Sequence, residues 1–190
     1  MNDPAVEGAI AFTDLVGFTE YTATQGDQEA LAVLGAQERI VRDALPASAR
    51  VVKELGDGLL IFFTDATTAI PGCLAILDGF DRAAEADEMP LWVRAGLHWG
   101  RPSSRGDDLI GHDVNVAARI VDVAAPGELL CSGPMLEAAA TDPSPGPGPG
   151  SGDGYVELGP VMMKGIPEPI DLFRVERAEL DDPAPIGGHR

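Results

Sequence analysis

Cysteine, lysine and long hydrophobic segments are all scarce in this sequence. Its two cysteines, Cys73 and Cys131, lie inside apolar stretches, which argues against a disulfide framework and favours a reducing compartment. No apolar run approaches the ~20 residues that a membrane-spanning helix needs, and the N-terminus lacks the basic and apolar segment of a signal peptide. We therefore expect a cytoplasmic protein without membrane contact, although a domain excised from a longer, even membrane-bound, protein would show the same pattern.

Positive charge is scarce as well. The chain has 13 Lys and Arg against 31 Asp and Glu, a formal net charge of −18. A surface this acidic repels nucleic-acid backbones and anionic membranes, so we expect neither as a partner. Solubility alone accounts for such a charge, but a small anionic ligand remains compatible with it where metal ions and a few basic side chains neutralise the repulsion. At 190 residues and 45% hydrophobic content, the chain is long enough to bury a hydrophobic core without disulfides or structural metal ions.

The most informative segment is a predicted β-hairpin over residues 49–63. Two β-rich runs flank Gly56-Asp57-Gly58, and an Asp-Gly pair can supply the positive φ angles of a tight turn. An aspartate at such a tip is often only a turn former. However, one of the chain's two lysines, Lys53, lies four residues before Asp57, and a second carboxylate, Asp14, ends another apolar run. Two carboxylates at strand ends suit a hard divalent cation such as Mg2+.

Hydrophobic periodicity predicts the order β-α-β-β-α-β for residues 6–100. The expected elements are a strand over 6–13, a helix capped by Asp27 and ended by Pro46, the hairpin, a helix capped by Asp65 and running to about Glu85, and a strand over 91–100. The expected buried faces of the helices are Leu31, Leu34, Ile40 or Val41 and Leu45, and Ile70, Leu74, Leu77 and Phe80. This is the ferredoxin-like order, an α+β fold with helices on one face of an antiparallel sheet. That fold hosts many activities and names none.

A C-terminal extension follows this core. Its expected elements are a polar loop over 101–107, a helix over 112–124, a strand over 127–132, a helix over 133–141 and a closing hairpin of 155–164 with 170–176. The first of these helices places Asn115 and Arg119 one turn apart on one face, with Val116, Ile120 and Val123 available for packing. Such an Asn/Arg pair by itself is usually a solvated helix face.

Two segments are expected to lack regular structure. The Pro/Gly-rich segment 143–154 predicts a flexible surface loop, and residues 177–190 predict a disordered tail. We therefore expect a single domain over residues 1–176. His98 and His112 have no Cys or His partner at metal-ligand spacing, so we expect structural roles for both.

Five motifs resemble those of the class III nucleotide cyclase catalytic domain, the adenylyl/guanylyl cyclase family. They are Phe12–Thr19, Lys53–Asp57, Arg94–Gly100, Gly111–Arg119 and Lys164–Pro169. Any one alone is modest evidence, but five in this order are specific. The resemblance covers roughly residues 6–176 and implies a cyclase-type domain with a ferredoxin-like core.

For metal binding, the resemblance implies that Asp14, Asp57 and the backbone carbonyl of Leu15 hold two divalent ions, Mg2+ or Mn2+. In the family, one ion lowers the pKa of the ribose 3′-hydroxyl and the other binds the phosphates. The hydroxyl attacks the α-phosphorus in line and within one molecule, so catalysis depends on orientation and charge stabilisation.

The resemblance also implies roles for three residues of the extension. Arg119 would contact the α-phosphoryl oxygens as charge builds, and its planar fork suits that task better than a lysine does. Asn115 would hold the ribose, and Lys164 would bind the β- and γ-phosphates.

Base recognition follows from the resemblance as well. In the family, adenine is read by a lysine that donates to its Watson–Crick edge and an aspartate that accepts from it, whereas guanine-specific members tend to carry glutamate and a small residue or cysteine. This chain has Lys53 and Asp108, the latter seven residues before Asn115, although Asp107 is adjacent and leaves a shift of one residue open. The resemblance therefore implies ATP as substrate, with 3′,5′-cyclic AMP and pyrophosphate as products.

Members of the family work as head-to-tail dimers with sites at the interface. One subunit supplies the metal aspartates and the other the residues for base, ribose and phosphate. Because this chain carries both halves, the resemblance implies a two-fold homodimer with two equivalent sites. The alternatives are a catalytically silent cyclase-like module that binds nucleotide or a partner, an acidic α/β domain without a shared site, and a diguanylate cyclase, whose glycine-pair hairpin signature this chain lacks.

Overall fold

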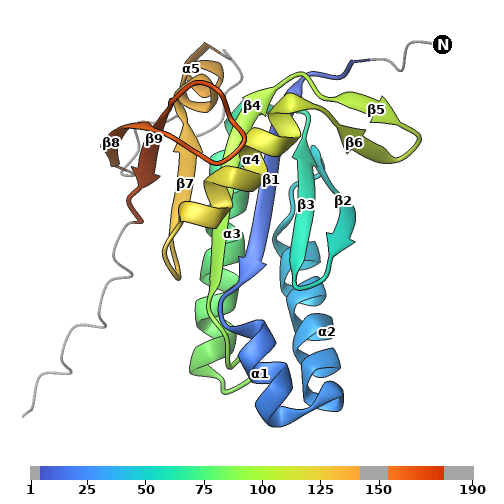
Figure 1. The fold of residues 1–190 in the computed structure, drawn as a ribbon. Coiled ribbons are helices and arrows are strands. Elements are labelled where there is room, and N and C mark those ends of the chain that lie inside the picture. The colour runs from blue at the N-terminus through green and yellow to red at the C-terminus, as the bar shows by residue number, and fades with distance from the viewer. Residues whose placement is uncertain (1–4, 142–153, 178–190) are drawn as a thin grey trace, which may run out of the picture.

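The computed structural model describes residues 5–141 and 154–177. The predicted flexible loop lies outside the described residues except for Gly154, and so does the predicted tail beyond Arg177. The elements, labelled in Figure 1, are β1 Gly8–Leu15, α1 Phe18–Gln25, α2 Asp27–Ala44, β2 Ala49–Leu55, β3 Gly58–Phe63, α3 Ala66–Glu85, β4 Val93–Gly100, β5 Ser103–Arg105, β6 Asp108–Ile110, α4 His112–Val123, β7 Leu129–Ser132, α5 Gly133–Thr141, β8 Tyr155–Val161 and β9 Ile170–Val175.

The ferredoxin-like core is present as predicted. The main sheet has the strand order β2-β3-β1-β4-β7-β9-β8, and β1 pairs antiparallel with both β3 and β4. The extension adds β7 beside β4 in the parallel sense, followed by the β9–β8 hairpin. No described helix is long and apolar enough to cross a membrane.

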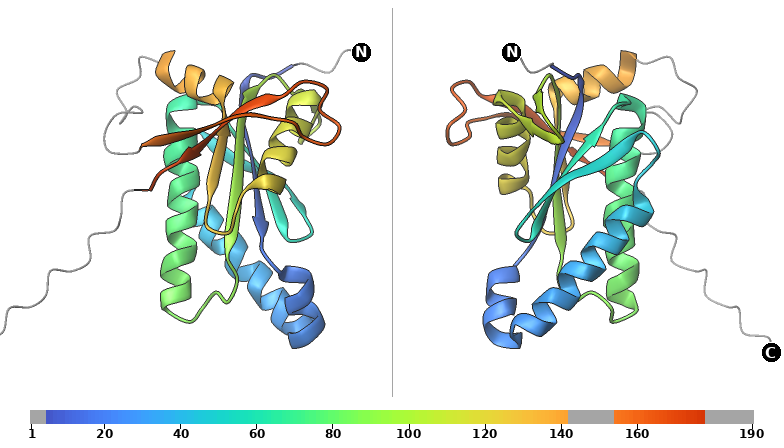
Figure 2. Two further views of the ribbon diagram at one scale, coloured as in Figure 1. Left: turned by 60° about the vertical axis from the view of Figure 1, so that its left-hand side comes forward. Right: turned by 90° about the vertical axis from the view of Figure 1, so that its right-hand side faces the viewer.

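The sheet is covered differently on its two faces, as the turned views of Figure 2 show. The larger core lies between the sheet and helices α2, α3 and α5, and a second core lies between the sheet and α4. Because side chains alternate along a strand, β1 feeds both cores. Ala9, Ala11 and Leu15 pack toward α2 and α3, while Ile10 and Phe12 pack toward α4. Asp14 continues the second series and therefore lies on the α4 side.

Three expectations for the region of α1 and α2 were wrong. α1 was not predicted because it has only eight residues and buries none of them fully, with only Phe18 and Tyr21 packing partly buried against the core. Asp27 is the first residue of α2 and not its cap, since Gly26 holds the N-cap position. The buried stripe of α2 is Ala30, Val33, Gln37 and Val41, whereas Leu31 is 68% exposed. Val41 is buried as predicted, and Leu34, Ile40 and Leu45 pack partly buried against the core, so the predicted stripe was wrong only at Leu31.

The prediction for α3 was confirmed in its main features. Asp65 caps the helix by accepting a hydrogen bond from the Thr67 N–H at 2.8 Å. Ile70, Leu77 and Phe80 are buried and Leu74 is partly buried.

Three expectations for the extension need correction. The polar loop over 101–107 is instead part of a small β5–β6 hairpin that stands apart from the main sheet. Val116 and Ile120 are buried as predicted, but Val123 is 48% exposed and α4 buries Val121 instead. Arg177, assigned to the disordered tail, is held by ion pairs to Asp78 and Asp81 of α3.

Candidate active site

Asp14 lies at the end of β1 with its carboxylate held by an arginine from the next strand. Asp14 is opposite Arg94 in the β1–β4 register, and directly opposite residues share a face of the sheet. Arg94 donates to Asp14 Oδ2 through Nε at 2.8 Å and Nη2 at 2.6 Å. Arg94 was not assigned a role from the sequence, although it begins one of the five motifs, and its position opposite Asp14 was the missing signal.

Asp57 lies beside Asp14 at the tip of the β2–β3 hairpin. The central residues of the turn are Gly56 and Asp57, and the positive φ of 72° falls on Gly56 and not on the Asp-Gly pair as predicted. Gly58 pairs with Asp14. A Cβ on Gly58 would lie 2.8 Å from the Thr13 carbonyl oxygen, closer than a real contact allows, so the close approach of β3 to β1 beside Asp14 requires glycine.

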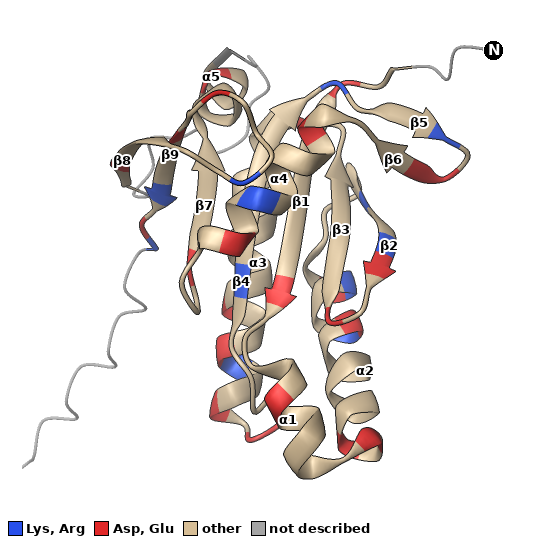
Figure 3. Ribbon diagram, viewed as in Figure 1, with Lys and Arg blue, Asp and Glu red and all other residues tan. Residues whose placement is uncertain are grey.

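The two carboxylates interact electrostatically. The pKa of Asp57 is raised, first because the carboxyl is partly buried and second because the negative charge of Asp14 is near; its own backbone hydrogen bond and Arg94 oppose this shift. Figure 3 shows acidic positions at the end of β1 and at the adjoining hairpin turn. A cation between the two carboxylates would relieve their repulsion.

This pair fits Mg2+ or Mn2+ by its donor chemistry. Within residues 5–141 and 154–177 no cluster of three or more His, Cys, Asp or Glu side chains could hold a metal ion. Mg2+ does not need one, because it keeps several waters and binds through one or two carboxylates together with substrate phosphates. The side chain of Leu15 is a hydrocarbon buried in the core, so only its backbone carbonyl carries a donor atom for a metal ion.

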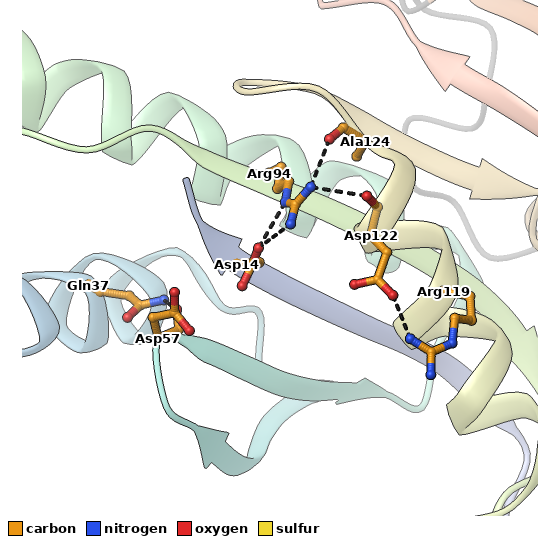
Figure 4. A network of polar contacts seen from close by, with 7 residues as sticks. All are labelled: Asp14, Gln37, Asp57, Arg94, Arg119, Asp122 and Ala124. Atoms are coloured by element: carbon orange, nitrogen blue, oxygen red, sulfur yellow. Dashed lines mark hydrogen bonds and ion pairs between the residues drawn. The ribbon is translucent and has the colours of Figure 1, made fainter. Parts of the chain in front are cut away.

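Arg94 also connects the carboxylate pair to helix α4 (Figure 4). Its Nη1 donates to the backbone carbonyls of Asp122 at 3.1 Å and Ala124 at 3.4 Å. The Asp122 carboxylate in turn accepts from Arg119 Nη1 at 2.6 Å. Asp14 and Arg119 are therefore linked within one chain only indirectly, over Arg94 and Asp122.

Lys53 and Asp108 form a second group, on β2 and at the start of β6. Lys53 Nζ lies 2.7 Å from the Asp108 carboxylate. That hydrogen bond is the main reason why the pKa of Asp108 is lowered. The adjacent Asp107, which the sequence left open as an alternative, instead accepts a hydrogen bond at its backbone carbonyl from Arg50. In the structure Lys53 therefore pairs with Asp108 and not with Asp107. Among the described residues, no hydrogen bond or ion pair joins this pair to Asp14 or Arg94.

The remaining predicted residues gather around α4. Asn115 and Arg119 are exposed on this helix. Lys164 is exposed in the turn after β8, between Met163 and Ile166, two buried residues that pack in one cluster with Val116 and Ile120 of α4.

A buried polar contact fixes the start of α4. His98 Nδ1 lies 2.8 Å from Ser132 Oγ, and His98 Nε2 lies 3.7 Å from Asp113 Oδ1. Asp113 also accepts from the Arg101 backbone N–H at 2.6 Å. Burial lowers the pKa of His98, against the opposing charge of Asp113. His98 thus has the structural role expected from the sequence.

Comparisons with known proteins find nucleotide cyclases among both the sequence relatives and the solved structures. No protein-family model matches the chain. The pH-sensitive adenylate cyclase of Mycobacterium tuberculosis (strain CDC 1551 / Oshkosh) is 30% identical over 170 residues, which are 88% of this chain and 40% of that protein. The chain spans less than half the length of this and the other curated relatives that head the comparison.

Solved structures share the fold across nearly the whole chain. The adenylyl cyclase CyaB from P. aeruginosa matches with a TM-score of 0.76 at 19% identity, covering 95% of this chain and 99% of that one. The guanylate cyclase domain of RhGC from Catenaria anguillulae, solved in complex with GTP, matches with a TM-score of 0.73 at 18% identity, covering 92% and 98%. The chain thus has the fold of class III nucleotide cyclase catalytic domains, and its sequence relatives include adenylate cyclases.

Proposed function

We propose that this chain is an adenylate cyclase that converts ATP to 3′,5′-cyclic AMP and pyrophosphate. The observation that carries the proposal is the nearness of two carboxylates: Asp14 near the end of β1 pairs with Gly58, and Asp57, in the turn just before Gly58, feels the charge of Asp14. Two neighbouring carboxylates in a chain of net charge −18 repel each other unless a cation binds to them. Their partial burial makes the need for a counter-charge stronger.

Two divalent ions would be held by Asp14, Asp57 and the Leu15 carbonyl. When bound, they would supply a lowered pKa for the ribose 3′-hydroxyl and charge compensation for the triphosphate. In their absence Arg94 balances the charge of Asp14. The planar guanidinium of Arg94 presents several N–H donors beside that site. Once a metal ion binds the Asp14 carboxylate, these donors could bond to a phosphate oxygen instead.

The residues of α4 would orient the nucleotide and stabilise charge on it. Arg119 must leave Asp122 to reach an α-phosphoryl oxygen, and this exchange is inexpensive because both side chains are largely exposed, 44% and 50%. Asn115 would hold the ribose and Lys164 the β- and γ-phosphates. The 3′-hydroxyl must lose its proton as its oxygen attacks the α-phosphorus, and because a bound divalent ion would lower the pKa of that hydroxyl, water would suffice to accept the proton.

The Lys53–Asp108 pair supports adenine over guanine. Lysine presents only donors and an ionised aspartate only acceptors, which matches adenine N1 and its exocyclic amine. The ion pair of 2.7 Å holds the two side chains close together before a base arrives. Guanine would present a donor to lysine and a carbonyl to aspartate, so both contacts would be lost.

We further propose a two-fold homodimer in which the two residue groups of one site come from different copies. The indirect path between Asp14 and Arg119 within one chain supports this, because the Arg94–Asp122 contact separates them. Two equivalent sites would then form at one interface.

The direct test is product formation from ATP and, separately, from GTP, with Mn2+ and then with Mg2+. The wild type should release cyclic AMP and pyrophosphate from ATP, with little product from GTP, and Asp57→Ala should lose activity by at least about 100-fold. Absence of any cyclic product with either metal, from protein shown to be dimeric, would leave a silent nucleotide-binding module as the better description.

A further inference from the structure

Gln37 is a polar residue at the centre of a buried helix face. It belongs to the stripe by which α2 packs against the sheet and is only 2% exposed. Such a stripe normally holds apolar residues, because burying an amide is costly unless its hydrogen bonds are replaced. A polar side chain at this position breaks the pattern of the helix, and departures of this kind tend to mark functional sites.

The partner of Gln37 is the backbone of the turn that carries Asp57. Gln37 Nε2 donates a hydrogen bond of 3.0 Å to the Asp57 carbonyl oxygen, across 20 residues of sequence. Figure 4 shows the Gln37 side chain reaching Asp57 from α2. The turn itself holds two residues between the paired Leu55 and Gly58, so this bond ties the hairpin tip to a helix that is anchored in the core.

We infer that Gln37 is a positioning residue for the metal site. It holds the Asp57 turn so that the carboxylate stays beside Asp14, and it contacts neither metal nor nucleotide. A ligand at a hairpin tip needs such support, because a functional group must be held to within about 0.5 Å of its working position. Loss of a hydrogen bond that orients a metal ligand typically weakens metal affinity by about 10–100-fold. This inference rests on the proposed function, since it presumes that Asp57 binds metal.

The test compares Gln37→Met with a matched control on the same helix face. Methionine keeps the length of the side chain and removes the donor, whereas Val33→Ala opens a small cavity one turn away and leaves the bond to Asp57 intact. Val33 is 4% exposed in the same core. Binding of Mn2+ to the nucleotide-free protein is followed by electron paramagnetic resonance, with folding checked by circular dichroism.

Gln37→Met should bind Mn2+ about tenfold more weakly than wild type, and Val33→Ala should bind within about twofold of wild type while melting at a lower temperature. The Mn2+ concentration that half-activates turnover should rise by the same factor in Gln37→Met, with kcat at saturating Mn2+ largely restored. Wild-type affinity in Gln37→Met, or equal weakening in Val33→Ala, would overturn the positioning role. If instead Asp57→Asn leaves Mn2+ affinity unchanged, the proposed metal site itself is wrong and the role of Gln37 falls with it.

Discussion

Replacing Arg94 with methionine should destabilise the metal-free protein and make its stability depend on divalent cations. Arg94 makes two donor contacts to Asp14, at 2.8 and 2.6 Å, and the two side chains are 25% and 27% exposed. It also holds the end of α4 through the carbonyls of Asp122 and Ala124. A hydrogen bond to a charged group contributes ~1.5–3 kcal/mol, and partial exposure lowers this. We therefore expect a loss of about 2 kcal/mol, or about 4–8 °C in melting temperature for a chain of this size.

The assay is thermal unfolding in EDTA and again with Mn2+, with Arg119→Met as the control. Arg119 also forms a 2.6 Å ion pair with a carboxylate, but the pair is 44% and 50% exposed, so its loss should change stability by no more than about 0.5 kcal/mol. With Mn2+, the gap between Arg94→Met and wild type should narrow, because a bound cation replaces the guanidinium charge and stabilises the folded state.

The reasoning is refuted if Arg94→Met and Arg119→Met melt within about 1 °C of one another in EDTA. It is also refuted if Mn2+ stabilises wild type and Arg94→Met by the same amount. Either result would mean that Arg94 is not the counter-charge of Asp14 in the metal-free protein.

Three further predictions follow from the same geometry. Burial and the charge of Asp14 raise the pKa of Asp57, so the ionised carboxylate destabilises the fold above that pKa. Asp57→Asn should therefore slightly raise the melting temperature at neutral pH in EDTA and abolish stabilisation by Mn2+. A lower melting temperature in EDTA would contradict this. Because burial lowers the pKa of His98 from 6.5, stability should fall as the pH drops below 6.5 through that lowered pKa, and His98→Gln should flatten a series of melts between about pH 7 and 5. Gly58→Ala should cost at least about 1 kcal/mol in urea unfolding, because the new Cβ would lie 2.8 Å from a backbone oxygen, whereas Gly35→Ala, with no atom within 4 Å, should be neutral or stabilising.

Local sequence signals predicted most of the core fold. The β2–β3 hairpin, the Asp65 cap of α3 and the alternating strand β4 were predictable because turn chemistry, capping and periodicity act within a few residues. α1 gave little such signal, since it has eight residues and contacts the core only through the partly buried Phe18 and Tyr21. The β5–β6 hairpin was missed for a similar reason, because its strands hold three residues each and lie apart from the main sheet.

The sequence motifs propose the residues of the site but not the contacts between them. The motifs named Asp14, Asp57, Lys53 and Asp108, and the pairing of the last two is seen in the structure. Arg94 and Gln37 were not predicted as part of the site. Their contacts depend on strand register and on a hydrogen bond across 20 residues, and a single sequence shows neither. Whether these groups act together across two copies of the chain remains a prediction.

The most direct measurement mixes two inactive variants, Asp14→Ala and Arg119→Ala, each of which damages a different residue group of the shared site. Random pairing should place half of the chains in mixed dimers, each with one intact site, so cyclic AMP formation from ATP should recover to about a quarter of the wild-type rate. No recovery, although mixed dimers are shown to form, would contradict a site assembled from two copies.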